Sequence, residues 1–591
     1  MIIPIRALRL RHSTAQTWRI NVVRNIASIG EHLTWAYDGL MQDSSTGSWP
    51  SFTDARFWYA WPGVKVRGKD SNTGERGLTI DPYLLGTVGA GRNTIVNADG
   101  ALETESARLA GVDLTYPITD TISLVGTLAP DFSNVETDQQ IIAPQEFPVQ
   151  YVEYRPFFAQ GAPYLNPNYA QFAPGSSVAT NQTFYSPSIG TFNRGLKIEG
   201  AQNRASFAIL NVSGFNQQQD QPFDDTAFGY KFAQPDRTFQ YWADGVFANH
   251  GEIGDDNTIE AGANGRNLNN GFVWAVDHAA EDGSFVPNRA AQSTYGFLDV
   301  HKPSYEVNVA YADISAGYNP IDGYTAGSDM HGLSAFGAIY ATAPWIKSYT
   351  LYLGQDRLFD RSGAVHLADT DGLVTATFKS GISIDNGGIM VSELRSYAVD
   401  DTINDELACN DPALQRTSFT GFPVYRCGKS STYNLFTVPL GYLDGTPTPV
   451  DVSVSAGHYG TQLVGQNDPG QDYVHLYTAS TSRSIGSINL GIEYNATYER
   501  ALLTDAFDSQ FLRRISIGQQ LDRNTNFSVA LRTINGIGGF AVPGTNFAVT
   551  FHRVFKRSSE LFVDFGTPAA VSTLDRFIVK YVLHFGPDIK S

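Results

Sequence analysis

The sequence predicts an all-β fold: a large closed antiparallel transmembrane β-barrel of about 20 to 26 strands with a lumenal or capping loop. Three observations predict it. Apolar and polar residues alternate in segments along the chain, and only 17% of its 591 residues are charged. No run of 18 or more predominantly apolar residues is present, so no transmembrane helix is indicated. Any membrane span would therefore be made of strands.

The alternation is clearest at residues 576–585, RFIVKYVLHF. Successive side chains of a strand point to opposite faces, so the odd positions form an apolar face with aromatic ends and the even positions a mixed polar face. Residues 488–498, 305–311 and 527–532 repeat this pattern. Roughly two dozen such segments lie between about 77 and 586, and a tilted membrane strand needs about 9 to 11 residues. Their number sets the expected strand count.

The composition of the two faces favours a membrane barrel over a soluble β-sandwich, which also alternates. The polar face carries Asn, Ser, Gly and Thr with scattered charges, as expected of a lumen. The apolar face carries aromatic residues near strand ends, as in the interfacial girdles of outer-membrane barrels. We therefore expect the apolar face to contact lipid, and the location to be a bacterial outer membrane in a Gram-negative-type envelope.

Residues 1–61 break the pattern, and they contain five of the eight tryptophans. Such a density predicts a remnant of another domain or a linker at the barrel mouth. The first confident span begins near residue 77, so we expect the barrel to occupy residues 77–591. The five residues are Trp18, Trp35, Trp49, Trp58 and Trp61.

Residues 131–190 also break the pattern, because they alternate poorly and contain seven prolines. Proline cannot donate to a strand ladder, and a long loop without strands is usually functional. We predict that this loop folds into the lumen or caps one mouth. Polar, turn-rich connections are predicted at 255–270, 400–430 and 465–472.

The chain has 59 acidic and 41 basic residues and a formal charge of -18. Nucleic-acid binding relies on clustered Lys and Arg, so this acidity excludes nucleic acid as the main partner. Acids that line the lumen would favour cations or neutral solutes over anions. Acids confined to the outer loops would say nothing about selectivity.

The two cysteines, Cys409 and Cys427, lie 18 positions apart in a turn-rich stretch. In an oxidising compartment this spacing suits a loop-closing disulfide. Two buried free thiols are the alternative.

The stretch from Asp131 to Gly161 reads DFSNVETDQQIIAPQEFPVQYVEYRPFFAQG. It resembles the motif of an uncharacterised bacterial family, a domain of unknown function, whose members join a module similar to family-nine carbohydrate-binding modules to an outer-membrane barrel. Tyr154 replaces the usual lysine, and Gln160 stands where an acid is common. The matching positions are Asp131, Phe132, Val135, Glu136, Asp138, Glu153, Arg155, Pro156, Phe157 and Phe158.

The resemblance implies an outer-membrane barrel, but it implies no activity, because none is established for the family. Residues 1–25 look like the final strands of the carbohydrate-binding-like module. On this view residues 1–76 are a remnant of that module and a linker. Residues 311–324 look like a later strand-turn segment of the family.

Two interpretations of the motif stay open. The planar guanidinium of Arg155 suits bidentate pairing with a carboxylate such as Glu136 or Asp138. This would make either a lumenal charge site that guides a solute or, as we favour, an ion-pair cluster that pins the loop to the wall. Phe157 and Phe158 are expected to be packing anchors rather than a platform for sugar rings.

The sequence predicts no metal, no cofactor and no enzyme activity. Residues 369–372, DTDG, have oxygen ligands and a glycine but lack the later glutamate of a calcium loop, so we expect a solvated turn. HExxH is missing, and GLSAFG at 332–337 lacks the GxSxG spacing. We assign no catalytic residue.

The leading hypothesis is a porin-like outer-membrane barrel that binds or passes a small solute, which could be glycan-derived, with outer-membrane lipid as its surroundings. One alternative is a soluble secreted β-rich protein that binds or hydrolyses polysaccharide. Another is a non-conducting barrel that serves as a surface scaffold.

Overall fold

The computed structural model describes most of residues 77–586, with main gaps at 90–93, 97–101, 105–109, 132–152 apart from Ile142, 168–180, 395–428 and 461–470 and short gaps elsewhere. Before residue 77 it describes the backbone of four short strands between 16 and 64. The predicted all-β class is confirmed.

Among the described residues, 24 strands form a closed barrel in which neighbours pair antiparallel. The alternating segments of the sequence predict about 20 to 26 strands. The strands are β5 (Thr79–Gly89), β8 (Ala110–Pro117), β9 (Ile122–Leu128), β10 (Arg194–Gln202), β11 (Ala205–Asn216), β12 (Gln221–Ala233), β13 (Phe239–Asn249), β14 (Asp255–Asn267), β15 (Phe272–Asp282), β16 (Ala291–Lys302), β17 (Tyr305–Ile314), β18 (Met330–Ala341), β19 (Ile346–Phe359), β20 (Val365–Phe378), β21 (Ser383–Leu394), β22 (Lys429–Thr437), β25 (Val450–Gly460), β26 (Gln471–Ile485), β27 (Ile488–Ala501), β28 (Phe507–Asp522), β29 (Thr525–Ile537), β30 (Gly544–Val554), β31 (Glu560–Phe565) and β32 (Arg576–Val582).

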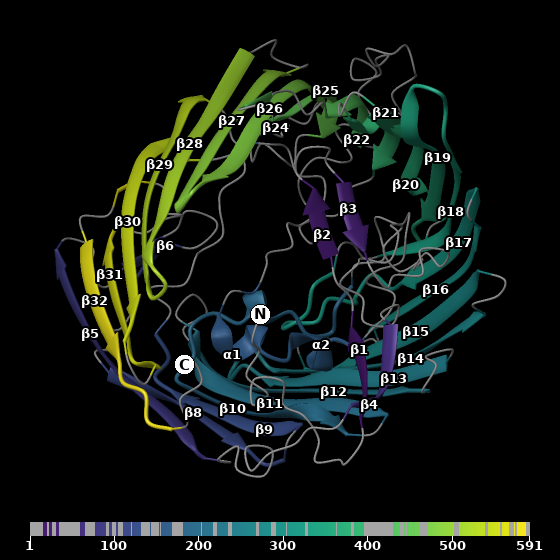
Figure 1. Cartoon of the computed structure of the whole chain (residues 1–591). Helices are drawn as coiled ribbons and strands as arrows, with labels where there is room; N and C mark the ends of the chain where they lie inside the picture. Colours follow the sequence, from purple (N-terminus) through teal and green to yellow (C-terminus); the bar gives the residue numbers. More distant parts are fainter. Residues whose placement is uncertain are drawn as a thin grey trace.

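The ring closes where β32 pairs with β5, so the last barrel strand in the sequence lies beside the first (Figure 1). Four short pairs lie outside this sheet order: β1 (Gln16–Ile20) with β4 (Tyr59–Val64), β2 (Val23–Ile26) with β3 (Glu31–Thr34), β6 (Thr94–Val96) with β7 (Leu102–Thr104), and β23 (Tyr442–Leu443) with β24 (Thr446–Pro447).

Apolar side chains of the strands point outward, and polar side chains point inward. In β17, Val307 and Val309 are 49% and 42% exposed, whereas Glu306 and Asn308 are each 1% exposed. In β32, Phe577 and Val579 are likewise on the outside. Contiguous outward apolar surface suits lipid rather than water. The predicted orientation of the two faces is confirmed, and the barrel is of the outer-membrane type.

The connections at the two ends of the barrel differ in length. At one end, adjacent strands are joined across residues 203–204, 486–487 and 523–524. At the other end, β9 is separated from β10 by residues 129–193, and β21 from β22 by residues 395–428. The site described below begins at the end with the long connections and extends along the strands to Glu306, near the end with the short connections.

Two sequence-based predictions are wrong. Residues 255–267 form strand β14 rather than a turn-rich connection, and residues 369–372 lie inside β20 rather than in a solvated turn. Asp256, Thr258 and Glu260 of β14 are buried. Their polarity resembles that of a loop because the inner face of this strand meets other polar groups rather than a hydrocarbon core.

Several predictions fall outside the described residues. These are the disulfide of Cys409 with Cys427, the connections at 400–428 and 465–470, and the side chains of the five N-terminal tryptophans. The domain boundary at residue 76 also stays a prediction. No helix in the described part of the chain is long and apolar enough to cross a bilayer.

Candidate functional site

Two short helices lie inside the ring of strands (Figure 1): α1 (Pro156–Ala159) and α2 (Ala162–Leu165). Residues 155–167 and 181–192, together here called the inner segment, pack against the inner face of β9 to β13. Phe158, Leu165 and Phe192 are at most 1% exposed. These side chains pack against small or aliphatic residues of the wall, including Ala208 and Leu210 of β11. The inner segment therefore has an apolar attachment to one wall.

Arg155 ties together distant parts of the inner segment. Its Nη2 lies 2.7 Å from Glu153 Oε2, and its Nη1 donates to the carbonyl of Ile189 at 2.7 Å and of Gly190 at 3.0 Å. The guanidinium also lies 4.4 Å from the ring centre of Phe158. These contacts join parts of residues 153–190 to one another rather than to a barrel strand. The predicted partners Glu136 and Asp138 lie outside the described residues, so an ion-pair cluster that pins the loop to the wall stays a prediction.

A buried ion pair fixes α1 to the wall. Lys197 Nζ of β10 lies 2.9 Å from Glu199 Oε2 and donates to the carbonyl of Phe157 at 2.7 Å. Gln160 donates to Glu199 Oε1 at 2.6 Å. A buried ion pair is stable only when its remaining hydrogen-bonding capacity is met, and the backbone of α1 meets it here.

Two glycines let the helices approach the wall. A Cβ at Gly229 of β12 would overlap the backbone carbonyl of Tyr164 in α2, and a Cβ at Gly161 would overlap the carboxylate of Glu199. Gly161 also has φ of 72°, in the left-handed region that glycine adopts readily. The helices thus lie directly against the strand backbones.

Other parts of the barrel wall also contact residues from the connection between β9 and β10. Asp131 is buried and lies 3.0 Å from Lys580 Nζ of β32. Ile142 packs with Leu512 and Ile534, and its carbonyl accepts a hydrogen bond from Thr497. The connection therefore reaches strands on both sides of the lumen.

Nine buried carboxyl groups lie on the inner faces of β12 to β17 and on the connection between β17 and β18. Among the side chains described on β12 to β17, no lysine or arginine is buried. We call this set the acid wall: Asp225, Asp244, Asp256, Glu260, Asp277, Glu281, Asp299, Glu306 and Asp322.

Two segments cover parts of the acid wall: the inner segment and residues 315–325 of the connection between β17 and β18. Their backbone N–H and hydroxyl groups donate hydrogen bonds to the carboxyl groups. Ile321 N donates to Asp256 Oδ2 at 2.6 Å, and Asn319 N donates to Glu281 Oε2 at 2.7 Å. Thr183 of the inner segment donates to Asp244. Asp244, Asp256 and Glu281 thus lie beneath the inner segment and residues 315–325, whereas Glu306 is bonded by His301 and Tyr340 of the barrel wall.

The far wall carries two neighbouring arginines. Arg514 of β28 and Arg532 of β29 are directly paired in register, and Arg532 is 4% exposed. Strands β28 and β29 face β13 to β15 across the ring in Figure 1. Glu493 of β27 is paired in register with Arg514, so this wall carries charges of both signs.

Some of these residues are predictable from the sequence and others are not. Phe157 and Phe158 are buried anchors, as favoured. Phe132, Glu136 and Asp138 lie outside the described residues. The acid wall was missed, although acids on alternate positions of strand-like segments could have indicated it.

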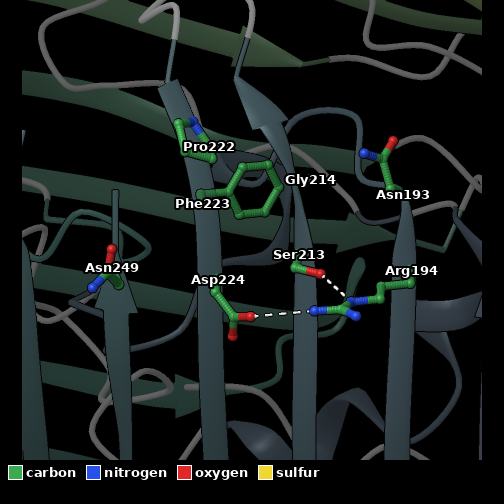
Figure 2. A pocket seen from close by; sticks show the side chains of 8 residues that line it. All are labelled: Asn193, Arg194, Ser213, Gly214, Pro222, Phe223, Asp224 and Asn249. Carbon is green, nitrogen blue, oxygen red and sulfur yellow. Dashed lines mark hydrogen bonds and ion pairs between the residues drawn. The ribbon is translucent and has the colours of Figure 1, made fainter. Parts of the chain in front are cut away.

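A hollow of about 500 Å³ at the long-connection end is lined by residues of four adjacent strands, with Arg194, Ser213 and Asp224 side by side (Figure 2). Arg194 Nη2 lies 3.7 Å from Asp224 Oδ2, and both side chains are more than half exposed. Exposed ion pairs contribute little free energy, whereas the carboxyl groups of the acid wall are buried. The acid wall is therefore the candidate site.

Solved structures with related strand arrangements are outer-membrane proteins. The siderophore receptor PirA from Pseudomonas aeruginosa matches at 8% identity and TM-score 0.39, over 86% of this chain and 80% of its own. The copper transporter OprC matches at 9% and 0.39, over 92% and 85%. The alcaligin outer-membrane receptor FauA from Bordetella pertussis matches at 7% and 0.34, over 86% and 75%. At these TM-scores the likenesses carry no argument about function.

No curated protein matches the sequence. A family model does match part of it, and this part includes the start of the connection between β9 and β10 and both inner helices. The predicted resemblance is confirmed by this match: residues 78–168 match the domain of unknown function DUF5916.

Proposed function

We propose that the protein is an outer-membrane barrel that binds or passes a small cationic or neutral solute, with the inner segment as the constriction. The observation that carries the proposal is the acid wall beneath the inner segment. Carboxylates along a pore favour cations, because each cation that enters offsets their negative charge. Because the inner segment covers part of the acid wall, these carboxyl groups would act on a solute in the lumen through their electric field rather than by direct contact.

The charge selectivity of the reconstituted barrel tests this proposal. In a planar bilayer under a KCl gradient, we expect a reversal potential that reports K⁺ permeating more readily than Cl⁻. The double variant Asp244→Asn/Glu260→Gln removes two neighbouring carboxyl groups, and it should lower the permeability ratio several-fold. Asp224→Asn is the matched control, because Asp224 is more than half exposed on the other face of β12. Chloride preference in the parent protein would contradict the proposal.

The finer proposal, a glycan-derived solute, rests on the module-like N-terminus predicted from the sequence. Phe157 and Phe158 do not support it, because their rings are buried against the wall. Adding neutral oligosaccharides to the conducting barrel tests it: a specific solute should block current at low concentration, and a lack of block across the tested sugars would argue against it.

The alternatives predict different results. A soluble secreted protein would leave the cell fraction in buffer as a monomer, whereas the proposed barrel needs detergent. A non-conducting scaffold would give no current from the parent protein or from a variant lacking residues 153–192.

A further inference from the structure

Three side chains from separate parts of the chain meet at the long-connection end of the barrel. Asp225 lies near the start of β12, His250 follows β13 directly, and Asp322 lies between β17 and β18. His250 Nε2 is 3.2 Å from Asp225 Oδ1 and 3.9 Å from Asp322 Oδ1. One nitrogen or oxygen from each residue falls within 4.8 Å of the other two.

The cluster is buried. Asp225 and Asp322 are each 2% exposed, and His250 is 6% exposed. The Oδ2 atoms of both aspartates are buried and make no hydrogen bond, although a buried carboxylate oxygen without a partner is costly. The ring of Phe223 lies 5.8 Å from that of His250 and closes one side. Geometry and burial therefore both point to a compact cation in the middle of the three side chains.

The donor set selects the kind of cation. Two carboxylates and one imidazole are ligands that Zn²⁺ accepts at about 2.0 to 2.2 Å, and imidazole disfavours Mg²⁺ and Ca²⁺ relative to transition metals. Two aspartates supply two negative charges, which match a divalent ion. We propose that Asp225, His250 and Asp322 form a binding site for a divalent transition-metal ion of the Zn²⁺ type.

The bound ion would join the wall to the inner segment. Asp322 belongs to the covering connection, and its carbonyl accepts a hydrogen bond from Tyr185 N at 2.6 Å. Asp256 holds the same connection through Ile321 N. A metal at Asp322 therefore fixes residues 315–325 and, through Tyr185, residues 181–189. This structural role does not depend on whether the barrel conducts.

A proton shared by the two aspartates is the competing explanation of their proximity. Burial raises the pKa of Asp322 well above its usual range, and the neighbouring Asp225 and Asp256 raise it further. A shared proton would satisfy one oxygen of the pair without a metal, so metal binding must be measured directly.

Titration of the whole barrel with Zn²⁺ tests the site. The protein is purified in detergent without a histidine tag, stripped with a chelator and titrated calorimetrically, with Co²⁺ absorption as a second probe. We expect one equivalent to bind. Asp322→Asn and Asp225→Asn should each weaken binding at least tenfold. Asp224→Asn, next to the site but on the other face of β12, should bind as the parent does, and so should His278→Gln, which removes an exposed histidine of β15.

Two results would overturn the proposal: no saturable one-equivalent binding to the parent barrel, or equal affinity in parent and Asp322→Asn. Heat-modified migration in gels establishes that each variant is folded. If a variant does not fold, the Co²⁺ spectrum of the parent decides: ligand-field bands that are abolished by one equivalent of Zn²⁺ support the site, and their absence refutes it.

Discussion

At the scale of the residue, Arg155 shows why the motif at 153–158 has its particular composition. One guanidinium bonds a carboxylate and the carbonyls of residues that follow some thirty positions later. Only arginine offers several donors in a fixed plane. The motif therefore works as a fastening within the lumen, a role that its sequence resemblance alone does not assign.

Arg155→Lys should loosen the inner segment, because a single ammonium cannot reach both the carboxylate and the carbonyls. Leaving buried acceptors without donors costs about 1–3 kcal/mol each. We expect faster proteolysis within residues 131–190 and a lower urea midpoint. Arg361→Lys is the control, since Arg361 pairs with Asp313 on an exposed edge. Equal protease sensitivity in both variants would contradict the role given to Arg155.

Asp322 predicts a pH dependence in metal-free buffer. Its pKa is raised in the folded protein, first by burial and then by Asp225 and Asp256, so the folded state binds this proton more tightly than the unfolded state. The stabilisation is fully present below the unfolded pKa of about 3.9 and is lost as the pH rises through the folded pKa. His250, the remaining residue of the cluster, has its Nε2 3.9 Å from Asp322 Oδ1.

In the parent protein, the free energy of unfolding should fall as the pH rises from 4 to alkaline values. In Asp322→Asn this fall should be smaller, because the side chain no longer loses a proton. Urea unfolding followed by tryptophan fluorescence in chelator measures this fall, with Asp224→Asn as the control. A parent protein and an Asp322→Asn variant with parallel pH profiles would refute the assignment.

The residue scale was only partly predictable from sequence. The burial of Phe157 and Phe158 was predicted, because two adjacent phenylalanines beside a proline favour anchoring. The Asp225, His250 and Asp322 cluster was not, since these residues are 25 and 72 positions apart and meet only through strand register and a returning connection.

At the scale of the element, alternation predicted the strands wherever the outward face is large and apolar. It failed at β14, where outward positions include Ala261 and Ala263 and inward positions carry acids. A strand with a small-residue outer face and an acidic inner face resembles a turn by composition. Recognising β14 as a strand would have required knowing which polar groups its acidic inner face meets inside the barrel.

Gly229 of β12 lies directly against the backbone of α2. Gly229→Ala places a methyl group where the carbonyl of Tyr164 lies, so α2 must move away from β12. Overpacking of this kind costs about 1–3 kcal/mol. We expect lower thermal stability and greater protease access near α2. Gly372→Ala in β20 is the matched control, because a Cβ there meets no atom within 4 Å. Equal melting temperatures would show that α2 does not depend on this contact.

At the scale of the whole molecule, composition and periodicity sufficed for the all-β class and for the orientation of the two faces, since both follow from the two-residue period of a strand in lipid. The path of the connection between β9 and β10 was predicted only as lumenal or capping. Its contacts with different parts of the wall depend on Asp131, Ile142 and Gly229 of β12, whose partners are set by the closed sheet. The gathering of the acid wall was equally hidden, because it depends on which strands are neighbours in the closed sheet.

The pairing of β32 with β5 has a consequence for biogenesis. The bond between His584 and Asp81 spans 503 positions, and contacts so distant in sequence form late and slowly. Before β32 pairs with β5, both edge strands of the sheet have unpaired backbone N–H and C=O groups, which promote aggregation. The nascent chain must therefore reach the membrane unfolded and protected from aggregation. A stop codon a few residues before Arg576 would remove β32, and the barrel could not close against β5.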